Sequence, residues 1–245
     1  MATISEDCMV KLWNLTDMDQ KFAEASSNDT ATMEPYLTLR GHTGPLLCAT
    51  SITDASRDSP NKSLLFTAGI EGNIRVWNVP QVSSIQPYGS TMDGKNHCIA
   101  VWQDPNEQEA IWDLKYHQFQ DLLLSLDANN LITLWDCSNV NIDGSEETNE
   151  GAIMRTFSYT PNSSDSLEKS DNATCMTWLV TQQNQFVVGY NNGHIVFFDI
   201  MSGELVSAQD LGVREINAIA AHKSRALVCA GHESGAVTVF DYSAD

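Results

Sequence analysis

The chain has 245 residues and carries 13 basic against 32 acidic side chains, which gives a net charge of −19. This excess of acid repels nucleic acid and anionic membranes, because both are polyanions, so binding to a phosphate backbone is disfavoured. No stretch approaches the roughly 18 consecutive apolar residues that a membrane span requires. The acidic surplus favours either solubility or attraction to a basic partner surface, and composition leaves both interpretations open.

One hairpin-like unit occurs five times along the sequence. Residues 64–78 show it most fully: an apolar run ends at Ala68, a turn follows at Glu71 and Gly72, and a second run ends in Trp77. Small or Gly-containing pairs between strand-like runs are a strong hairpin signal, because primed turns require positive φ. The other units lie at residues 5–14, 127–136, 190–199 and 232–241.

The aromatic residues that end the five units set the period of the repeat. They are Trp13, Trp77, Trp135, Phe198 and Phe240, roughly 40–65 residues apart, compared with about 40–45 in a WD40 repeat. The Gly41-His42 pair stands upstream of the second hairpin, where a WD repeat opens. We therefore predict an all-β fold, a partial WD40 β-propeller with about five blades represented, the first of them truncated.

We predict that residues 1–245 form one incomplete propeller domain. A complete propeller has about 4–8 blades, and an unpaired sheet edge is a liability, so we expect a fragment of a longer propeller. A closed small propeller is the alternative. Polar inserts are expected to be surface loops because they are too polar to add to a core; they lie at about residues 17–35, 54–62, 80–95, 138–150 and 160–172.

Each well-formed WD blade links a His, a Ser or Thr, a turn Asp and a Trp by hydrogen bonds, because buried polar groups must be paired. The second repeat has His42 and Trp77, with Glu71 in place of the turn Asp. The departures from the full set predict modest stability in the fourth and fifth blades. The remaining structural positions are Ser5, Asp7 and Trp13, then Asn129 and Trp135, Asn192 and Phe198, and Ser234 and Phe240.

The sequence offers no case for an enzyme, a cofactor or a metal site. His42 beside acidic and hydroxyl residues resembles part of a hydrolytic triad, but its position in the repeat favours a structural role. The other His residues lack metal-ligand spacing, and no phosphate-binding loop motif is present. The six cysteines are scattered without a Cys-x-x-Cys pair, which is typical of small core residues in a reduced compartment.

Several runs resemble the C-terminal WD40 domain of the striatin family. Residues 3–15 are similar to the end of that domain's first repeat, and residues 36–47 with 68–80, including the Trp77-Asn78-Val79-Pro80 ending, to its second. Residues 110–116 and 121–135 fit the third, and residues 216–241 resemble a central repeat. The resemblance implies a seven-bladed parent propeller. The family's coiled-coil, caveolin-binding and calmodulin-binding segments have no match in this sequence.

The resemblance implies a non-catalytic scaffold and protein–protein interaction module, because striatin-like proteins are regulatory subunits of protein phosphatase 2A. Expected partners are phosphatase 2A subunits, a Mob-like protein, germinal-centre-type kinases and striatin-interacting proteins. We expect a cytoplasmic location, with membrane association through partners. The alternative is a generic WD40 adaptor, such as a ubiquitin-ligase substrate receptor or a vesicle-trafficking subunit. A role in nucleic-acid binding ranks below both, because the charge opposes it.

Overall fold

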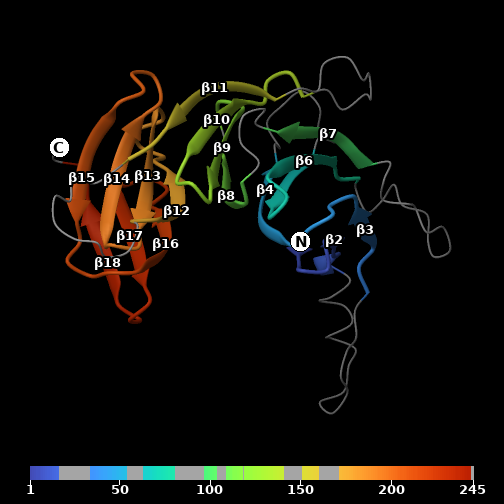
Figure 1. Cartoon of the computed structure of the whole chain (residues 1–245), viewed down its shortest axis with the longest axis horizontal. Helices are drawn as coiled ribbons and strands as arrows, with labels where there is room; N and C mark the ends of the chain where they lie inside the picture. Colours follow the sequence, from blue (N-terminus) through green and yellow to red (C-terminus); the bar gives the residue numbers. More distant parts are fainter. Residues whose placement is uncertain are drawn as a thin grey trace, which may run out of the picture. The chain divides into compact units, whose positions relative to one another are not determined.

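The computed structural model describes residues 1–16, 34–53, 63–80, 97–103, 109–117, 119–140, 151–159 and 171–243, and the polar inserts fall largely outside these ranges. The regular elements of the described chain are antiparallel β-strands (Figure 1). They belong to two compact units. Unit 1 comprises residues 1–108 and 140–150, and unit 2 comprises residues 109–139 and 151–245.

Unit 1 contains two sheets. The first has the order β1 (Ala2–Ile4), β2 (Met9–Leu12) and β3 (Leu37–Arg40). The second has four strands in chain order, β4 (Leu46–Thr53), β5 (Ser63–Gly69), β6 (Asn73–Asn78) and β7 (Cys98–Gln103).

Unit 2 contains three sheets. The third sheet of the chain consists of β8 (Ile111–Tyr116), β9 (Leu122–Asp127), β10 (Ile132–Asp136) and β11 (Ala152–Phe157). The fourth consists of β12 (Ala173–Trp178), β13 (Gln185–Tyr190), β14 (His194–Asp199) and β15 (Leu205–Asp210). The fifth has three strands, β16 (Ile216–Ala221), β17 (Leu227–His232) and β18 (Val237–Asp241).

The predicted all-β, blade-like organisation is confirmed, and the first sheet is partial as expected. The described part of the fifth sheet has three strands, with β18 at an edge, because no described strand pairs with its outer side.

All five predicted hairpins form, but their turns are longer than the two-residue primed turns that the sequence indicated. In the second hairpin β5 ends at Gly69 and β6 begins at Asn73, so three residues connect the strands, and the Gly72 amide donates to the carbonyl of Gly69. Only the last turn residue has positive φ, and a primed turn would need it earlier. The five residues in this left-handed conformation are Cys8, Gly72, Asn130, Gly193 and Gly235.

Alternating side chains pack successive sheets of each unit against one another. In unit 1, Val10, Leu12 and Leu39 pack with Leu65 and Trp77 of the next sheet. In unit 2, one cluster joins the third and fourth sheets and contains the rings of Phe157, Phe186 and Phe198. A second cluster joins the fourth and fifth sheets through side chains that include Phe197, Ile216 and Val228. Burial of apolar area between sheets is the main stabilising term in such stacks.

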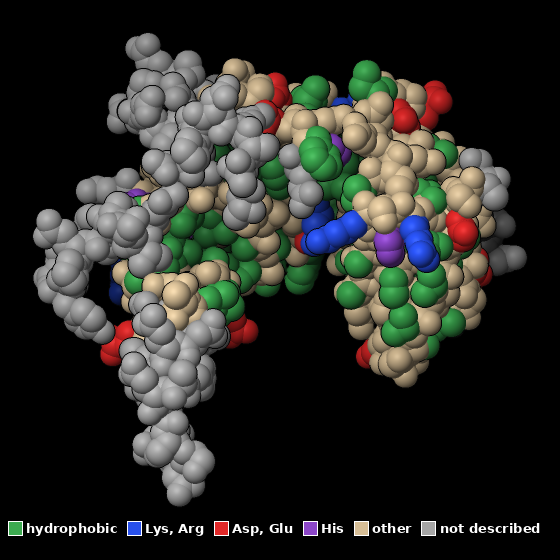
Figure 2. Space-filling model, turned by 180° about the vertical axis from the view of Figure 1, so that it is seen from behind, with side chains coloured by type: hydrophobic (Ala, Val, Ile, Leu, Met, Phe, Trp, Pro, Cys, Tyr) green, Lys and Arg blue, Asp and Glu red, His purple; other side chains and the backbone are tan. Residues whose placement is uncertain are grey.

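Apolar side chains also reach the surface, as Figure 2 shows for one face of the molecule. Scattered exposed apolar residues are normal in soluble proteins, whereas clusters mark contacts with other molecules. Among described residues, the large apolar side chains that are more than half exposed are Met1, Trp112, Phe119, Met154, Met201, Val237 and Val239.

Candidate functional site

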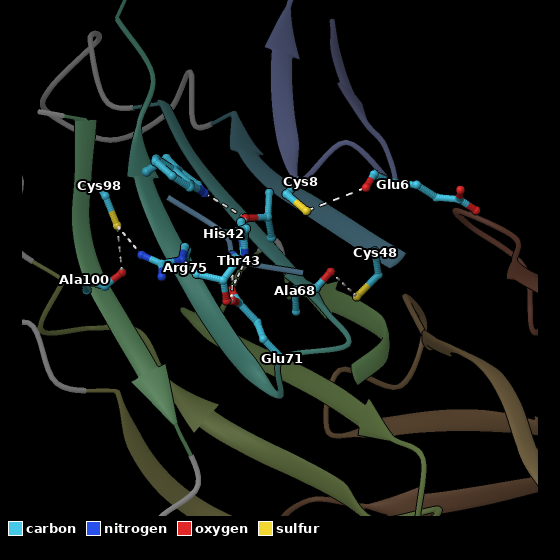
Figure 3. A network of polar contacts seen from close by, with 12 residues as sticks. Glu6, Cys8, His42, Thr43, Cys48, Ala68, Glu71, Arg75, Cys98 and Ala100 are labelled. Carbon is cyan, nitrogen blue, oxygen red and sulfur yellow. Dashed lines mark hydrogen bonds and ion pairs between the residues drawn. The ribbon is translucent and has the colours of Figure 1, made fainter. Parts of the chain in front are cut away.

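The second sheet contains a polar network that links its strands to the segment before them (Figure 3). The indole Nε1 of Trp77 donates to Thr67 Oγ1 at 2.7 Å, and Thr67 Oγ1 lies 2.7 Å from His42 Nε2. His42 Nδ1 contacts the Glu71 carboxylate, which also accepts from the Thr43 amide at 2.9 Å and the Thr43 hydroxyl at 2.6 Å. The network therefore runs from β6 across β5 to the segment before β4.

The donors and acceptors of this network fix its protonation state. Because Thr67 accepts from Trp77, its own proton points to His42 Nε2, and His42 Nδ1–H then donates to Glu71. Burial lowers the pKa of His42 despite the nearby carboxylate, so the ring is neutral at physiological pH. Burial would raise the pKa of Glu71, but hydrogen bonds from Thr43 and His42 outweigh it and hold that pKa below its usual value.

We expect Glu71→Gln to destabilise unit 1 by about 1–3 kcal/mol, because an amide cannot accept on both terminal atoms and leaves a donor unpaired. Urea unfolding monitored by far-UV circular dichroism measures the effect. Glu6→Gln is a suitable control, since Glu6 is exposed in the first hairpin. Equal midpoints for the two variants would contradict a stabilising role for Glu71.

The Trp-to-hydroxyl contact recurs wherever the hairpin ends in Trp. Trp13 Nε1 donates to Thr3 Oγ1 and Trp135 Nε1 to Ser125 Oγ, each at 2.8 Å. In all three sheets the hydroxyl precedes the Trp by ten residues. Ser5 is not the partner of Trp13; its Oγ accepts from the Asp7 amide at 3.5 Å.

Where the hairpin ends in Phe, the position ten residues earlier is apolar. Phe198 has Val188 there and Phe240 has Ala230, and both of these are buried. An indole N–H must be paired when it is buried, whereas a phenyl ring has no donor to satisfy. The aromatic residue and the residue ten positions before it therefore change together, from Trp with a hydroxyl to Phe with an apolar side chain. This pairing can be recognised in the sequence once the register of the hairpin is known.

Three of the predicted structural positions, Asp7, Asn192 and Ser234, cap the turns of their hairpins. Asp7 Oδ1 accepts from the Met9 amide at 3.1 Å, Asn192 Oδ1 from the His194 amide at 3.0 Å, and Ser234 Oγ from the Ala236 amide at 3.4 Å. In the third hairpin this role belongs to Asp127, whose Oδ1 accepts from the amides of Asn129 and Leu131. Short polar side chains favour turns through such bonds to the backbone.

We expect stability to fall as the pH drops below about 6.5, because burial lowers the pKa of His42 and of His117 and the unfolded chain then binds more protons. The depressed pKa of Glu71 adds a further loss below about pH 4.5, since the stabilising form is the carboxylate. Urea midpoints measured between about pH 7.5 and about pH 5.5 test the first effect. His42→Gln should flatten this dependence and the exposed His222→Gln should not; the same slope in both would overturn the assignment.

A band of hydrogen-bonded turns crosses unit 2 at the end where the first strand of each sheet begins. Asn130 Oδ1 accepts from the Ala173 amide at 2.8 Å, which joins the third and fourth sheets. Asn191 Oδ1 accepts from the Asn172 amide at 2.9 Å, and the Asn191 carbonyl accepts from the Glu215 amide at 2.8 Å. We call this surface the turn rim; it comprises residues 109–112, 127–131, 171–174, 191–193, 214–217 and 233–235. Hydrogen bonds between neighbouring sheets therefore hold the turns of this rim in place.

Trp112 is the largest exposed side chain of the turn rim, at 51% exposure. It is the extra residue of a β-bulge, because Ile111 pairs with Asp127 while Asp113 already pairs with Leu126. Bulges re-aim side chains, and here the bulge turns a large aromatic out of the sheet. Exposed Trp on a rigid surface is typical of protein-binding hot spots, although the sequence pattern alone gives no reason to single out Trp112.

The described residues contain no group of three or more His, Cys, Asp or Glu arranged to hold a metal ion. Within the same ranges, no helix is long and apolar enough to cross a membrane. All six cysteines are free thiols, and Cys48, Cys137 and Cys175 are buried.

Comparison with known proteins finds WD repeats and striatins. The family model described as WD domain, G-beta repeat, matches residues 33–78, which include His42, Glu71 and Trp77. Striatin-4 from Mus musculus is 24% identical over 98% of this chain, and the striatin homolog from Dictyostelium discoideum is 26% identical over 100% of it. The chain is similar to striatins along nearly its whole length.

This chain corresponds to only part of each striatin relative. Human striatin is 32% identical over 142 residues, which cover 57% of this chain and 16% of striatin. The chain spans about 28% of the length of striatin-4 and of the Dictyostelium homolog. Striatin homologues and the WD repeat support a role in protein–protein interaction and point to a non-catalytic protein.

Proposed function

We propose that this chain is a non-catalytic scaffold module of a striatin-like regulatory subunit, acting in an assembly of protein phosphatase 2A with kinases. The observation that carries the proposal is the similarity to striatins along nearly the whole chain. The candidate partners are phosphatase 2A subunits, a Mob-like protein, germinal-centre-type kinases and striatin-interacting proteins, in the cytoplasm.

The turn rim of unit 2 is the surface we assign to partner binding. Hydrogen bonds between neighbouring sheets hold its turns, so little conformational entropy is lost when a partner binds. Trp112 supplies the large amphipathic side chain that interface centres favour. Exposed acidic residues at the rim, Glu109 and Glu233, favour a partner with basic side chains at its periphery.

Affinity purification of the tagged 245-residue chain tests the assembly. We expect phosphatase 2A subunits and a Mob-like protein in the eluate, and repeated absence of both would overturn the proposal. Recovery of ubiquitin-ligase or vesicle-coat subunits in their place would support the generic adaptor.

We expect Trp112→Ala to reduce partner recovery about tenfold, because truncating a central Trp commonly costs more than 1 kcal/mol of binding energy. The matched control is Phe119→Ala, which removes a 67% exposed aromatic ring in the turn that follows β8, away from the rim. Quantitative mass spectrometry of the eluates measures the difference. Equal recovery with both variants would show that partners bind elsewhere.

A further inference from the structure

Arg155 of β11 reaches from the third sheet to the fourth. Its backbone pairs with Leu134 of β10, whose side chain belongs to the apolar cluster between these two sheets. A Cβ built on Gly203, in the turn between β14 and β15, would overlap Arg155 Nη1 and lie 3.0 Å from Arg155 Cδ. The guanidinium therefore lies directly against the backbone of that turn.

The turn that Arg155 contacts is fixed by its own hydrogen bonds. Asp199 Oδ1 accepts from the amides of Met201 at 2.9 Å and Ser202 at 2.8 Å, and the Asp199 carbonyl accepts from the Gly203 amide at 2.9 Å. Bonds from Ser202 and Met201 hold the pKa of the Asp199 carboxyl below its usual value. Gly203 has a φ of 79°, which suits glycine, and its missing side chain leaves room for Arg155.

The positive charge of Arg155 is not neutralised within the described chain. Lys11, Arg75 and Lys115 form ion pairs, whereas no described acidic residue pairs with Arg155, although the sequence has 32 acidic side chains. Arg155 is also partly buried, so it has lost some of its hydration. Burying a charge costs free energy unless an opposite charge pairs with it. The position is therefore suited to an anion from another molecule.

Exposed apolar side chains border Arg155. Met154, directly before it, is 57% exposed and is the extra residue of the bulge between β10 and β11. Met201 and Leu205 are 70% and 44% exposed. Leu205 pairs with Phe198 of the shared apolar cluster, so it stands on the face of the fourth sheet that looks toward the third. We call this surface the Arg155 patch; it comprises Met154, Arg155, Met201, Gly203 and Leu205, and it joins two four-stranded sheets.

We propose that the Arg155 patch binds an extended segment of a partner protein through an Asp or Glu side chain flanked by apolar residues. The carboxylate accepts hydrogen bonds from the Arg155 guanidinium, whose planar fork matches carboxylate geometry. The apolar neighbours cover Met154, Met201 and Leu205, and methionine side chains adapt readily to different partners. One guanidinium matches one carboxylate, whereas phosphate is generally recognised by several Arg side chains.

The Arg155 patch is separate from the turn rim, because residues 199–204 and 191–193 lie at opposite ends of β14. The inference therefore goes beyond the scaffold proposal and does not depend on Trp112.

An oriented peptide library, with Glu fixed at the centre and the flanking positions randomised, is the probe. Selection on the full chain should give apolar residues beside the Glu. A labelled peptide of the selected sequence should then show saturable binding in fluorescence polarisation. A library that yields no binding peptide, or peptides without an apolar preference, would overturn the proposal.

We expect Arg155→Gln to weaken binding of this peptide about tenfold, because the charge-assisted bond is lost. Replacing the central Glu of the peptide by Gln should cost a similar factor with the unaltered chain and little more with Arg155→Gln, since both changes break the same bond. The control is Arg225→Gln, which removes the same charge from an exposed turn of the fifth sheet and should change affinity by less than about twofold. Equal effects of the two Arg variants, or additive losses in the cycle, would contradict the pairing.

Met201→Ser tests the apolar part of the patch without disturbing the core, because the Met201 side chain is 70% exposed. We expect binding about fivefold weaker and an unchanged urea midpoint, which keeps the test decisive if Arg155→Gln lowers stability. Unchanged affinity would overturn the proposed apolar contact. A peptide with phosphoserine in place of the Glu should bind more weakly, and tighter binding would show that the patch selects phosphate instead.

Discussion

Trp77→Ala should destabilise unit 1 by about 3–5 kcal/mol, the usual cost of deleting a buried Trp side chain. Trp77 is 0% exposed and packs among Val10, Leu12 and Leu65, so its removal leaves a cavity between two sheets. The substitution also removes the donor to Thr67 and so disturbs the chain of bonds that ends at Glu71.

Urea unfolding followed by far-UV circular dichroism measures this loss, and hydrogen exchange in β2–β6 locates it. Trp112→Ala is the contrast, because half of that side chain is exposed and the expected change is within about 0.5 kcal/mol. A loss below about 1 kcal/mol for Trp77→Ala would mean that the ring is not part of the core.

The hairpins were predictable because their signals are local. A turn with a residue able to adopt positive φ, such as Gly72 or Asn130, followed by an alternating apolar run ending in an aromatic, can be read within about ten residues. Five occurrences in one register then indicate stacked sheets. The turn type was not predictable from the pair of turn residues alone, since the Gly72 amide closes the turn on Gly69.

The network partners were only partly predictable. His42, Glu71 and Trp77 are marked by their repeat positions, but Thr67, on the neighbouring strand, is identified only when the register of β5 on β6 is known. Ser5 in the first repeat illustrates the difficulty, because Thr3, two residues earlier, bonds to Trp13.

The turn rim was not predicted because it depends on contacts between sheets. Asn130 bonds to Ala173 across 43 residues of sequence, and no local pattern encodes that distance. The exposure of Trp112 was likewise not predicted, because an aromatic residue in an alternating strand is expected to be buried. Only the bulge turns it outward. The single-domain organisation of residues 1–245 and the polar inserts remain predictions, because the inserts lie mostly outside the described ranges.

Phe198→Ala should destabilise unit 2 by about 3–5 kcal/mol, although its hairpin lacks the Trp-to-hydroxyl bond. The Phe198 ring is 2% exposed, stacks on Phe186 at 5.2 Å between centroids and lies 5.7 Å from Phe157. Aromatic pairs in these geometries add about 0.5–1.5 kcal/mol beyond area burial, which offsets the missing hydrogen bond.

This substitution separates two opposite expectations for the fourth blade. The incomplete set of polar residues predicts modest stability, whereas the aromatic cluster predicts a core as strong as that of the second sheet. Phe240→Ala is the comparison, because Phe240 is only partly buried and its ring lies 5.9 Å from that of Phe197; we expect a loss below about 2 kcal/mol. Comparing the urea midpoints of the two variants distinguishes these two expectations. Losses of similar size would mean that the fourth sheet draws no extra stability from its aromatic cluster, and that the missing polar network governs both blades.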